Sequence, residues 1–297
     1  MSSLRANRRG IIALIISLGA FTANDAVVKL VARSYPPGEV ILLRGLMTVV
    51  AIAAMMTMLG QARMARQALD GRVLARSLFD ALGAVLFVSA LVHMGLAELS
   101  AVLLVSPLIM TALSVLLNHE AVGWRRWTAI AVGFVGTLFV VKPTPSAFDA
   151  WALLGLGAAI AGAARDLTTR HIDPGVPVTV ISLAALVAVM LMGALLGLGE
   201  SWRMMAAADI GLLAAAAAFL GTGTYLVVIA FRDSEISLVA PFRYTLLLWS
   251  GLAGYVVFGE LPDRFAIIGG SLIVASGLYA LHREGVRRRE KAARDRE

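Results

Sequence analysis

Runs of apolar residues, separated by short polar breaks, recur along the whole chain. A helix that crosses a bilayer needs about 20 such residues, because each residue adds about 1.5 Å to its length. The pattern therefore predicts ten membrane-spanning helices, at roughly 10–32, 39–59, 72–94, 97–118, 125–141, 149–170, 176–198, 208–231, 235–259 and 264–282. The breaks contain turn signals such as Tyr35-Pro36-Pro37-Gly38 and Asp173-Pro174-Gly175.

The composition indicates that these runs are not the core of a soluble protein. Hydrophobic residues make up 59% of the chain and charged residues 15%, whereas soluble domains have about 45–50% and about 25%. We therefore expect an integral membrane protein in contact with the lipid bilayer. Cysteine is absent and the four histidines lie far apart in the sequence, so we expect no metal and no other cofactor.

The basic residues are unevenly distributed between alternate breaks. If both termini are cytoplasmic, the inner segments hold nineteen Lys and Arg residues and the outer segments hold four. The positive-inside rule then predicts a multi-pass protein of the plasma (inner) membrane with both termini in the cytoplasm. The net charge of +7 does not indicate a nucleic-acid partner, since seven basic residues follow the last apolar run, a typical place to meet anionic lipid headgroups.

The two halves of the chain share a charge pattern. Asp25 and Lys29 in the first predicted span recur as Asp166 and Arg170 in the sixth. Because each half has an odd number of spans, the second half would enter the membrane from the opposite side, which is typical of transporters with a substrate site near the midplane.

The predicted fold is therefore an all-α membrane protein with ten transmembrane helices in two inverted five-helix repeats. The first repeat comprises residues 1–145 and the second, inverted repeat comprises residues 146–284. Residues 285–297 form a basic cytoplasmic tail.

The chain resembles the drug/metabolite transporter superfamily, and within it the EamA-type branch. The residues that carry this resemblance are Asn24 with Lys29, Pro36-Pro37-Gly38-Glu39 before Arg44, Glu120, Leu238-Val239-Ala240-Pro241-Phe242-Arg243-Tyr244 and Phe258-Gly259-Glu260-Leu261-Pro262-Asp263. The resemblance implies export or facilitated movement of amino acids, other metabolites or cationic toxins, with vitamin or nucleotide-like uptake in some members. Ala185 stands at the second-half position that corresponds to Arg44, so the two repeats are expected to differ chemically.

Polar residues lie inside the first two predicted spans, where water is scarce. Counting about 1.5 Å per residue places Asp25, Lys29 and Arg44 about 10, 5 and 7 Å below the outer surface. Asp25 and Lys29 also share one helix face, because they are four residues apart. We expect Asp25, Lys29 and Arg44 to form an outer cluster, with the carboxylate offsetting one or both cations. These three residues and Asn24 are candidates for binding a substrate or gating its pathway. The alternative is a structural ion pair that fixes helix packing.

A second pair of charges matches in depth near the cytoplasmic side. Asp80 in the third span and Arg243 in the ninth each lie about eight residues from the inner end of their helix. Their contact would join the two halves. Arg76, four residues before Asp80, is a competing partner, and a packing ion pair is again the alternative.

A few aromatic residues accompany these charges, namely Phe79, Tyr225, Tyr244 and Trp249. Ring faces beside a carboxylate and an arginine would suit a planar zwitterion such as an aromatic amino acid, or a flat heterocycle. Packing against other helices or lipid is the more ordinary role of such residues.

The sequence thus predicts a transporter of small metabolites that works by alternating access through a central cavity. An amino-acid exporter or facilitator is favoured, with aromatic amino acids as the preferred substrates, and uptake of a vitamin or nucleotide-like metabolite is the alternative. Protons are a candidate coupling partner through Asp25 or Asp80, and a monomer and a homodimer both remain open. The chain is predicted not to be an enzyme, and a membrane-embedded enzyme or a scaffold is the alternative of a different class.

Overall fold

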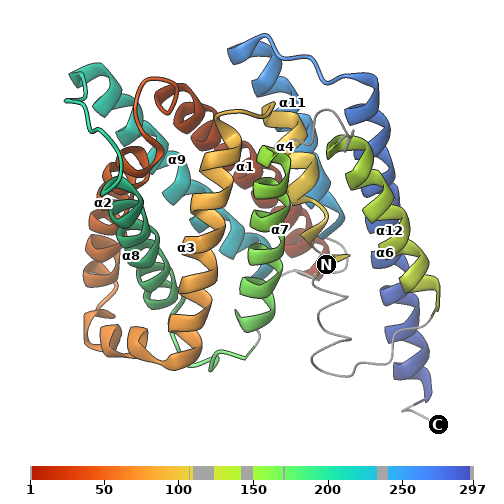
Figure 1. Ribbon diagram of the computed structural model, residues 1–297. Coiled ribbons are helices and arrows are strands. Elements are labelled where there is room, and N and C mark those ends of the chain that lie inside the picture. Colours follow the sequence, from red (N-terminus) through yellow and green to blue (C-terminus); the bar gives the residue numbers. More distant parts are fainter. Residues whose placement is uncertain are drawn as a thin grey trace.

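The computed structural model describes residues 2–106, 108–109, 124–141, 150–169, 171–232 and 240–294, which form helices and contain no β-strand (Figure 1). In chain order the helices are α1 (Ser2–Val31), α2 (Pro37–Met58), η1 (Ala62–Leu69), α3 (Gly71–Leu91), α4 (Leu96–Leu103), α6 (Trp124–Val141), α7 (Ala150–Thr169), α8 (Val178–Gly197), α9 (Ala207–Arg232), η2 (Ala240–Tyr244), α11 (Thr245–Phe258) and α12 (Arg264–Arg294). Glu120, Arg170 and residues 238–239, named above, lie outside the described residues.

Local chemistry sets several helix ends. The Asp70 carboxylate accepts hydrogen bonds from the Arg72 and Val73 amides at 2.9 and 3.4 Å, which satisfies free donors at the start of α3. α11 is followed by Gly259, whose φ of 67° lies in the left-handed region that favours glycine and so stops the helix. The Asp263 carboxylate then accepts from the Ala266 amide at 2.8 Å and so begins α12.

The structure confirms an all-α membrane protein. Within the described part of the chain, five helices are long and apolar enough to cross a membrane, namely Arg8–Val31, Pro37–Met58, Gly71–Leu91, Val178–Gly197 and Ala207–Leu226. Shorter apolar helices lie at Ala131–Val140, Phe242–Phe258 and Arg264–Tyr279. Each of the ten predicted ranges overlaps a helix, but α4 covers only the start of its range, so the count of ten spans stays a prediction.

Helices from residues 1–145 pack chiefly on helices from residues 146–284. The main pairs are α1 with α9, α2 with α8, α3 with both α7 and α8, and α6 with α12, and α4 packs on α11. The largest buried apolar cluster draws on both groups, with Val28, Val40, Leu99, Leu213 and Ile273 among its members. Burial of these side chains therefore holds the two parts of the chain together.

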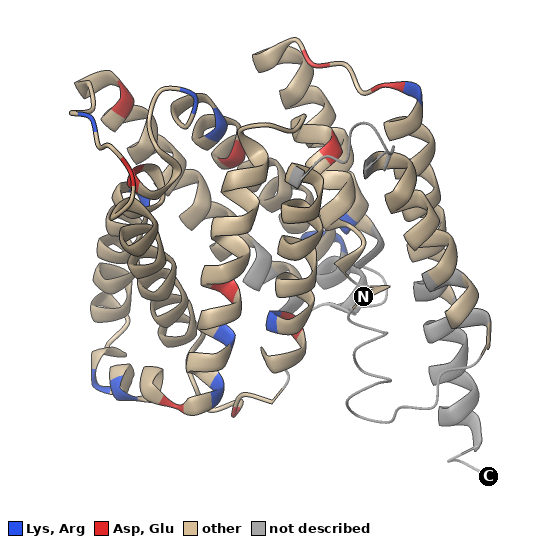
Figure 2. Ribbon diagram, in the orientation of Figure 1, with Lys and Arg blue, Asp and Glu red and all other residues tan. Residues whose placement is uncertain are grey.

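Charged residues gather toward the ends of the bundle and leave long stretches of the helices uncharged (Figure 2). This distribution is what a bilayer demands, because an unpaired charge at its centre costs about 2.5–3.5 kcal/mol on insertion scales. The few charged side chains that do lie within helices are therefore expected to have partners.

At one edge of the bundle α6 and α12 lie alongside each other (Figure 1). The two helices are in close contact at Gly136 and Gly269, where a Cβ atom added to Gly136 would lie 2.8 Å from the Gly269 carbonyl oxygen. A Cβ added to Gly269 would likewise collide with the Gly136 carbonyl. Because the obstacle is backbone, no side-chain rotation can relieve it.

We expect Gly269→Ala to destabilise the protein by about 1–3 kcal/mol, the usual cost of overpacking. The matched control is Gly251→Ala, since a Cβ at Gly251 would have no atom within 4 Å and helical Gly→Ala changes normally stabilise. Thermal unfolding of both variants in detergent measures the difference. Equal midpoints would contradict a tight contact between α6 and α12.

Candidate functional site

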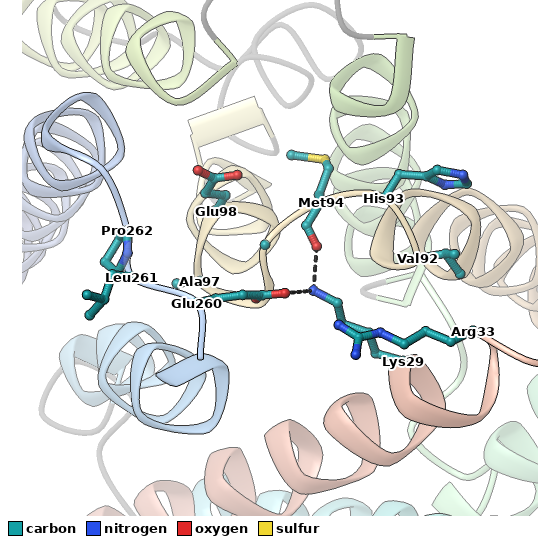
Figure 3. Close-up of a pocket in the computed structure, with 11 residues that line it drawn as sticks. Lys29, Arg33, Val92, His93, Met94, Ala97, Glu98, Glu260, Leu261 and Pro262 are labelled. Atoms are coloured by element: carbon teal, nitrogen blue, oxygen red, sulfur yellow. Dashed lines mark hydrogen bonds and ion pairs between the residues drawn. The ribbon is translucent and has the colours of Figure 1, made fainter. Parts of the chain in front are cut away.

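A pocket of about 280 Å³ opens where α1 ends, where α3 turns into α4, and where α11 connects to α12 (Figure 3). Most of its polar lining comes from charged side chains and one histidine. The lining residues are Lys29, Arg33, Val92, His93, Met94, Gly95, Ala97, Glu98, Glu260, Leu261 and Pro262.

Lys29 is the centre of a polar network in this pocket. Its Nζ donates to the Met94 carbonyl oxygen at 2.7 Å and pairs with Glu260 Oε1 at 2.5 Å. The other oxygen of Glu260 accepts from the Leu96 amide at 3.0 Å, at the start of α4, where a carboxylate is favoured. The Lys29 side chain is 3% exposed and that of Glu260 is 29% exposed, so the network is largely desolvated.

Two cations share the ring of Phe258, the residue that ends α11. Lys29 Nζ lies 4.8 Å from the ring centroid and Arg33 Cζ lies 4.7 Å from it. The ring therefore holds both positive groups at one place by cation–π attraction. On another side of the pocket, His93 stacks on Trp151 with 3.5 Å between ring centroids.

The predicted outer cluster is present only in part. Arg44 Nη1 donates to Asn24 Oδ1 at 3.0 Å, and Asn24 Nδ2 donates to Asp25 Oδ1 at 2.9 Å. The depth match between the first two spans therefore placed Asp25 and Arg44 correctly, and Asn24 lies between them. The predicted place of Lys29 in this cluster is wrong, because its carboxylate partner is Glu260 and not Asp25.

Asp80 pairs with Arg76, the competing partner, and with Arg165, instead of with Arg243. Its two oxygens accept from Arg76 Nη1 at 2.9 Å and from Arg165 Nη1 at 3.0 Å, and Arg165 also pairs with Asp166 at 2.9 Å. Arg243 lies in η2 with an exposed side chain, so the proposed Asp80–Arg243 contact is wrong. An ion pair between the two parts of the chain nevertheless exists, because Arg165 belongs to α7.

The four predicted aromatic residues do not line the pocket described above. Trp249 donates from Nε1 to the Ile15 carbonyl oxygen at 3.0 Å and packs against α1. The Tyr244 hydroxyl abuts Gly277 on α12, and the Tyr225 side chain is 60% exposed. Phe79 is partly buried beside Asp80. The packing alternative fits Trp249 and Tyr244 best, and a binding role for the four residues stays a prediction.

Sequence reasoning missed the role of Glu260, Arg165 and Arg33. Glu260 was noted for the resemblance, and it follows the ninth predicted span at the surface from which Lys29 lies about 5 Å deep. That shared depth was the available signal for an ion pair. Arg165 was visible in the sequence only as a charge beside Asp166. Nothing in the sequence showed that α7 packs on α3 and so brings Arg165 to Asp80.

These features define the class of protein: an α-helical, multi-pass membrane protein whose two parts are joined by partly buried ion pairs. Residues 8–142 match the EamA-like transporter family. The resemblance to the EamA-type branch of the drug/metabolite transporter superfamily is thus confirmed, on this match and on the relatives that follow.

Three curated relatives are transporters, and none has an enzyme's name. The pseudopaline exporter CntI of Pseudomonas aeruginosa (strain UCBPP-PA14) is 27% identical over 275 residues, covering 91% of this chain and 94% of that protein. A riboflavin transporter of Rhizobium johnstonii is 27% identical over 221 residues, covering 74% and 73%. The S-adenosylmethionine uptake transporter of Rickettsia prowazekii is 26% identical over 179 residues, 60% of each chain.

The fold is shared with a solved crystal structure. It has 18% sequence identity and a TM-score of 0.61, and the match covers 94% of this chain and 97% of that one. At this identity the likeness concerns the arrangement of helices, which agrees with the all-α architecture.

Proposed function

We propose that this protein transports small metabolites across the plasma (inner) membrane by alternating access, with both termini in the cytoplasm. Amino acids are the preferred substrate class, aromatic ones among them, moved as by an exporter or facilitator. The family match and the three named transporters support the general activity.

The observation that carries the mechanism is the presence of two ion-pair networks far apart along α3. The Lys29–Glu260 network includes the Met94 carbonyl, in the turn after α3, whereas the Asp80–Arg165 pair joins the interior of α3 to α7. Asp80 and Met94 are fourteen residues apart, which corresponds to about 20 Å of helix. Each network joins a residue of 1–145 to a residue of 146–284, so each can hold one mouth of a pathway closed.

The helix packing supports the proposed division into two inverted repeats, 1–145 and 146–284. If α1, α2, α3, α4 and α6 exchange places with α7, α8, α9, α11 and α12, the contact of α1 with α9 becomes that of α7 with α3. The pairs α2–α8, α4–α11 and α6–α12 map onto themselves. With a two-fold relation of this kind, the two repeats can exchange conformations. The exchange converts a state open to one side of the membrane into a state open to the other.

The size of the pocket favours a small substrate. Ligand pockets usually enclose about 300–1,000 Å³, and this one encloses about 280 Å³. Its lining offers both positive and negative groups, which suits a zwitterion. A vitamin or nucleotide-like solute is the second candidate, because a riboflavin transporter is among the relatives.

Flux of radiolabelled L-phenylalanine into proteoliposomes tests the proposal. We expect saturable uptake that unlabelled amino acids inhibit, and flux driven by an imposed proton gradient if protons are coupled. The same vesicles are then challenged with riboflavin. A scaffold or membrane-embedded enzyme would give no saturable flux of any solute, which would reject transport.

A further inference from the structure

We infer that Arg33 binds the carboxylate of the transported solute, and that this carboxylate then replaces Glu260 on Lys29. The inference rests on the proposed transport function and adds to it both a substrate class and a substrate-operated link between the two parts of the chain. It makes small carboxylates, α-amino acids above all, the ligands of the pocket.

The first argument is the local balance of charge. Lys29 and Arg33 are held against the same Phe258 ring, yet the carboxylate of Glu260 pairs only with Lys29. Among the described residues Arg33 makes no ion pair, and its side chain is exposed. In Figure 3 its guanidinium lies beside Lys29, while Glu98 lies on the other side of the pocket. One further anion is therefore favoured between the two cations.

The second argument is the geometry of the guanidinium. Arginine presents a planar fork of donors that matches a carboxylate through two parallel hydrogen bonds. Stacking on Phe258 restrains this fork in advance, which reduces the entropy lost on binding. A carboxylate bound at the edge of the guanidinium would lie next to Lys29 Nζ.

The third argument is that replacement keeps every buried group paired. When the solute carboxylate takes the place of Glu260, Lys29 retains an anion and the Met94 carbonyl. Glu260 retains the Leu96 amide and, for an amino acid, can accept the ammonium group of the solute together with Glu98. The link from α1 to the α11–α12 connection is then broken only when the solute is bound, so movement is coupled to occupancy.

The experiment compares three solutes that differ by one group: L-phenylalanine, 3-phenylpropanoate, which lacks the ammonium, and phenethylamine, which lacks the carboxylate. The variants are Arg33→Gln, Arg33→Lys and Glu260→Gln. The matched control is Arg264→Gln, since Arg264 lies over the Phe265 ring at 5.2 Å but does not line the pocket. Phenylalanine flux gives KM, and a thermal shift by 3-phenylpropanoate gives binding without transport.

We expect Arg33→Gln to raise the KM for phenylalanine about tenfold, the equivalent of about 1.4 kcal/mol. Arg264→Gln should leave this KM unchanged, and Arg33→Lys should give an intermediate KM. Glu260→Gln should enlarge the thermal shift by 3-phenylpropanoate, because it removes the anion that competes for Lys29 and this solute has no ammonium group for Glu260 to accept. A merely structural role of Glu260 would not produce this larger shift. Phenethylamine should neither compete nor shift the melting temperature.

Equal recognition of phenethylamine and phenylalanine, or unchanged KM and thermal shift in Arg33→Gln, would overturn the inference and leave transport standing. The inference would also be overturned, with transport left standing, if the protein transported other solutes but neither transported phenylalanine nor showed a thermal shift with 3-phenylpropanoate. Absence of saturable flux for every solute would reject transport itself, and the thermal shift by 3-phenylpropanoate would still decide whether Arg33 binds a carboxylate.

Discussion

Replacing Lys29 with Met is expected to reduce phenylalanine flux at least tenfold and to destabilise the protein by about 1–3 kcal/mol. Removing one member of a fully buried ion pair costs about 3–5 kcal/mol, because the other charge is left without a partner. Glu260 keeps some contact with solvent at 29% exposure and keeps the Leu96 amide, so the expected loss is smaller. Thermal unfolding in detergent and proteoliposome flux measure the two effects.

The double variant Lys29→Met/Glu260→Gln separates stability from function. Without either charge the desolvation cost disappears, so the melting temperature should return close to that of the parent while flux remains low. Recovery of both would mean that the pair serves only to hold the fold.

The absence of cysteine from the chain allows a direct measurement of opening. Ala97 lines the pocket, so a single Ala97→Cys substitution reports access to it. A membrane-impermeant maleimide should label this cysteine faster when Lys29→Met is added, because the link between α1 and the α11–α12 connection is lost. An unchanged labelling rate would contradict the assignment of Lys29–Glu260 as a closing contact.

Replacing Asp80 with Asn is expected to have the second large effect, again at least a tenfold loss of flux. Asp80 is shared by Arg76 and Arg165, so its neutralisation leaves two guanidinium groups close together with one carboxylate fewer. Asp166→Asn is the matched control, since Asp166 contacts Arg165 alone in this network and leaves the α3–α7 link in place. Its flux should fall much less.

In the labelling experiment, Asp80→Asn should change the labelling rate in the direction opposite to Lys29→Met. If the Asp80 network closes the far mouth, weakening it shifts the population toward the state in which the Lys29 end is closed. Labelling of Ala97→Cys should therefore slow in Asp80→Asn and quicken in Lys29→Met. If both variants changed the labelling rate in the same direction, the two ion-pair networks would not close the two mouths alternately.

Several features of this protein were predictable from local properties of the sequence. Apolar run length and turn residues were enough for the helices, because hydrogen bonds within one segment satisfy a helix backbone in lipid. The proximity of Asp25 and Arg44 was expected from their similar depth in adjacent spans, and in the structure Asn24 links the two. The match to the EamA-like family over residues 8–142 agrees with a resemblance that residues such as Asn24 and Lys29 had already suggested.

Only the tertiary structure decided which charges meet. Depth gives one coordinate of a side chain, whereas pairing also needs the neighbour and the direction in which the side chain points. Asp80 pairs with Arg165 because α3 packs on α7, and Lys29 pairs with Glu260 because the α11–α12 connection reaches the end of α1. Such contacts join residues far apart in the chain, so no local pattern records them. The sequence by itself therefore determined the helices and the resemblance to the EamA-type branch, and the packing of helices determined the ion pairs between the two parts of the chain and the pocket.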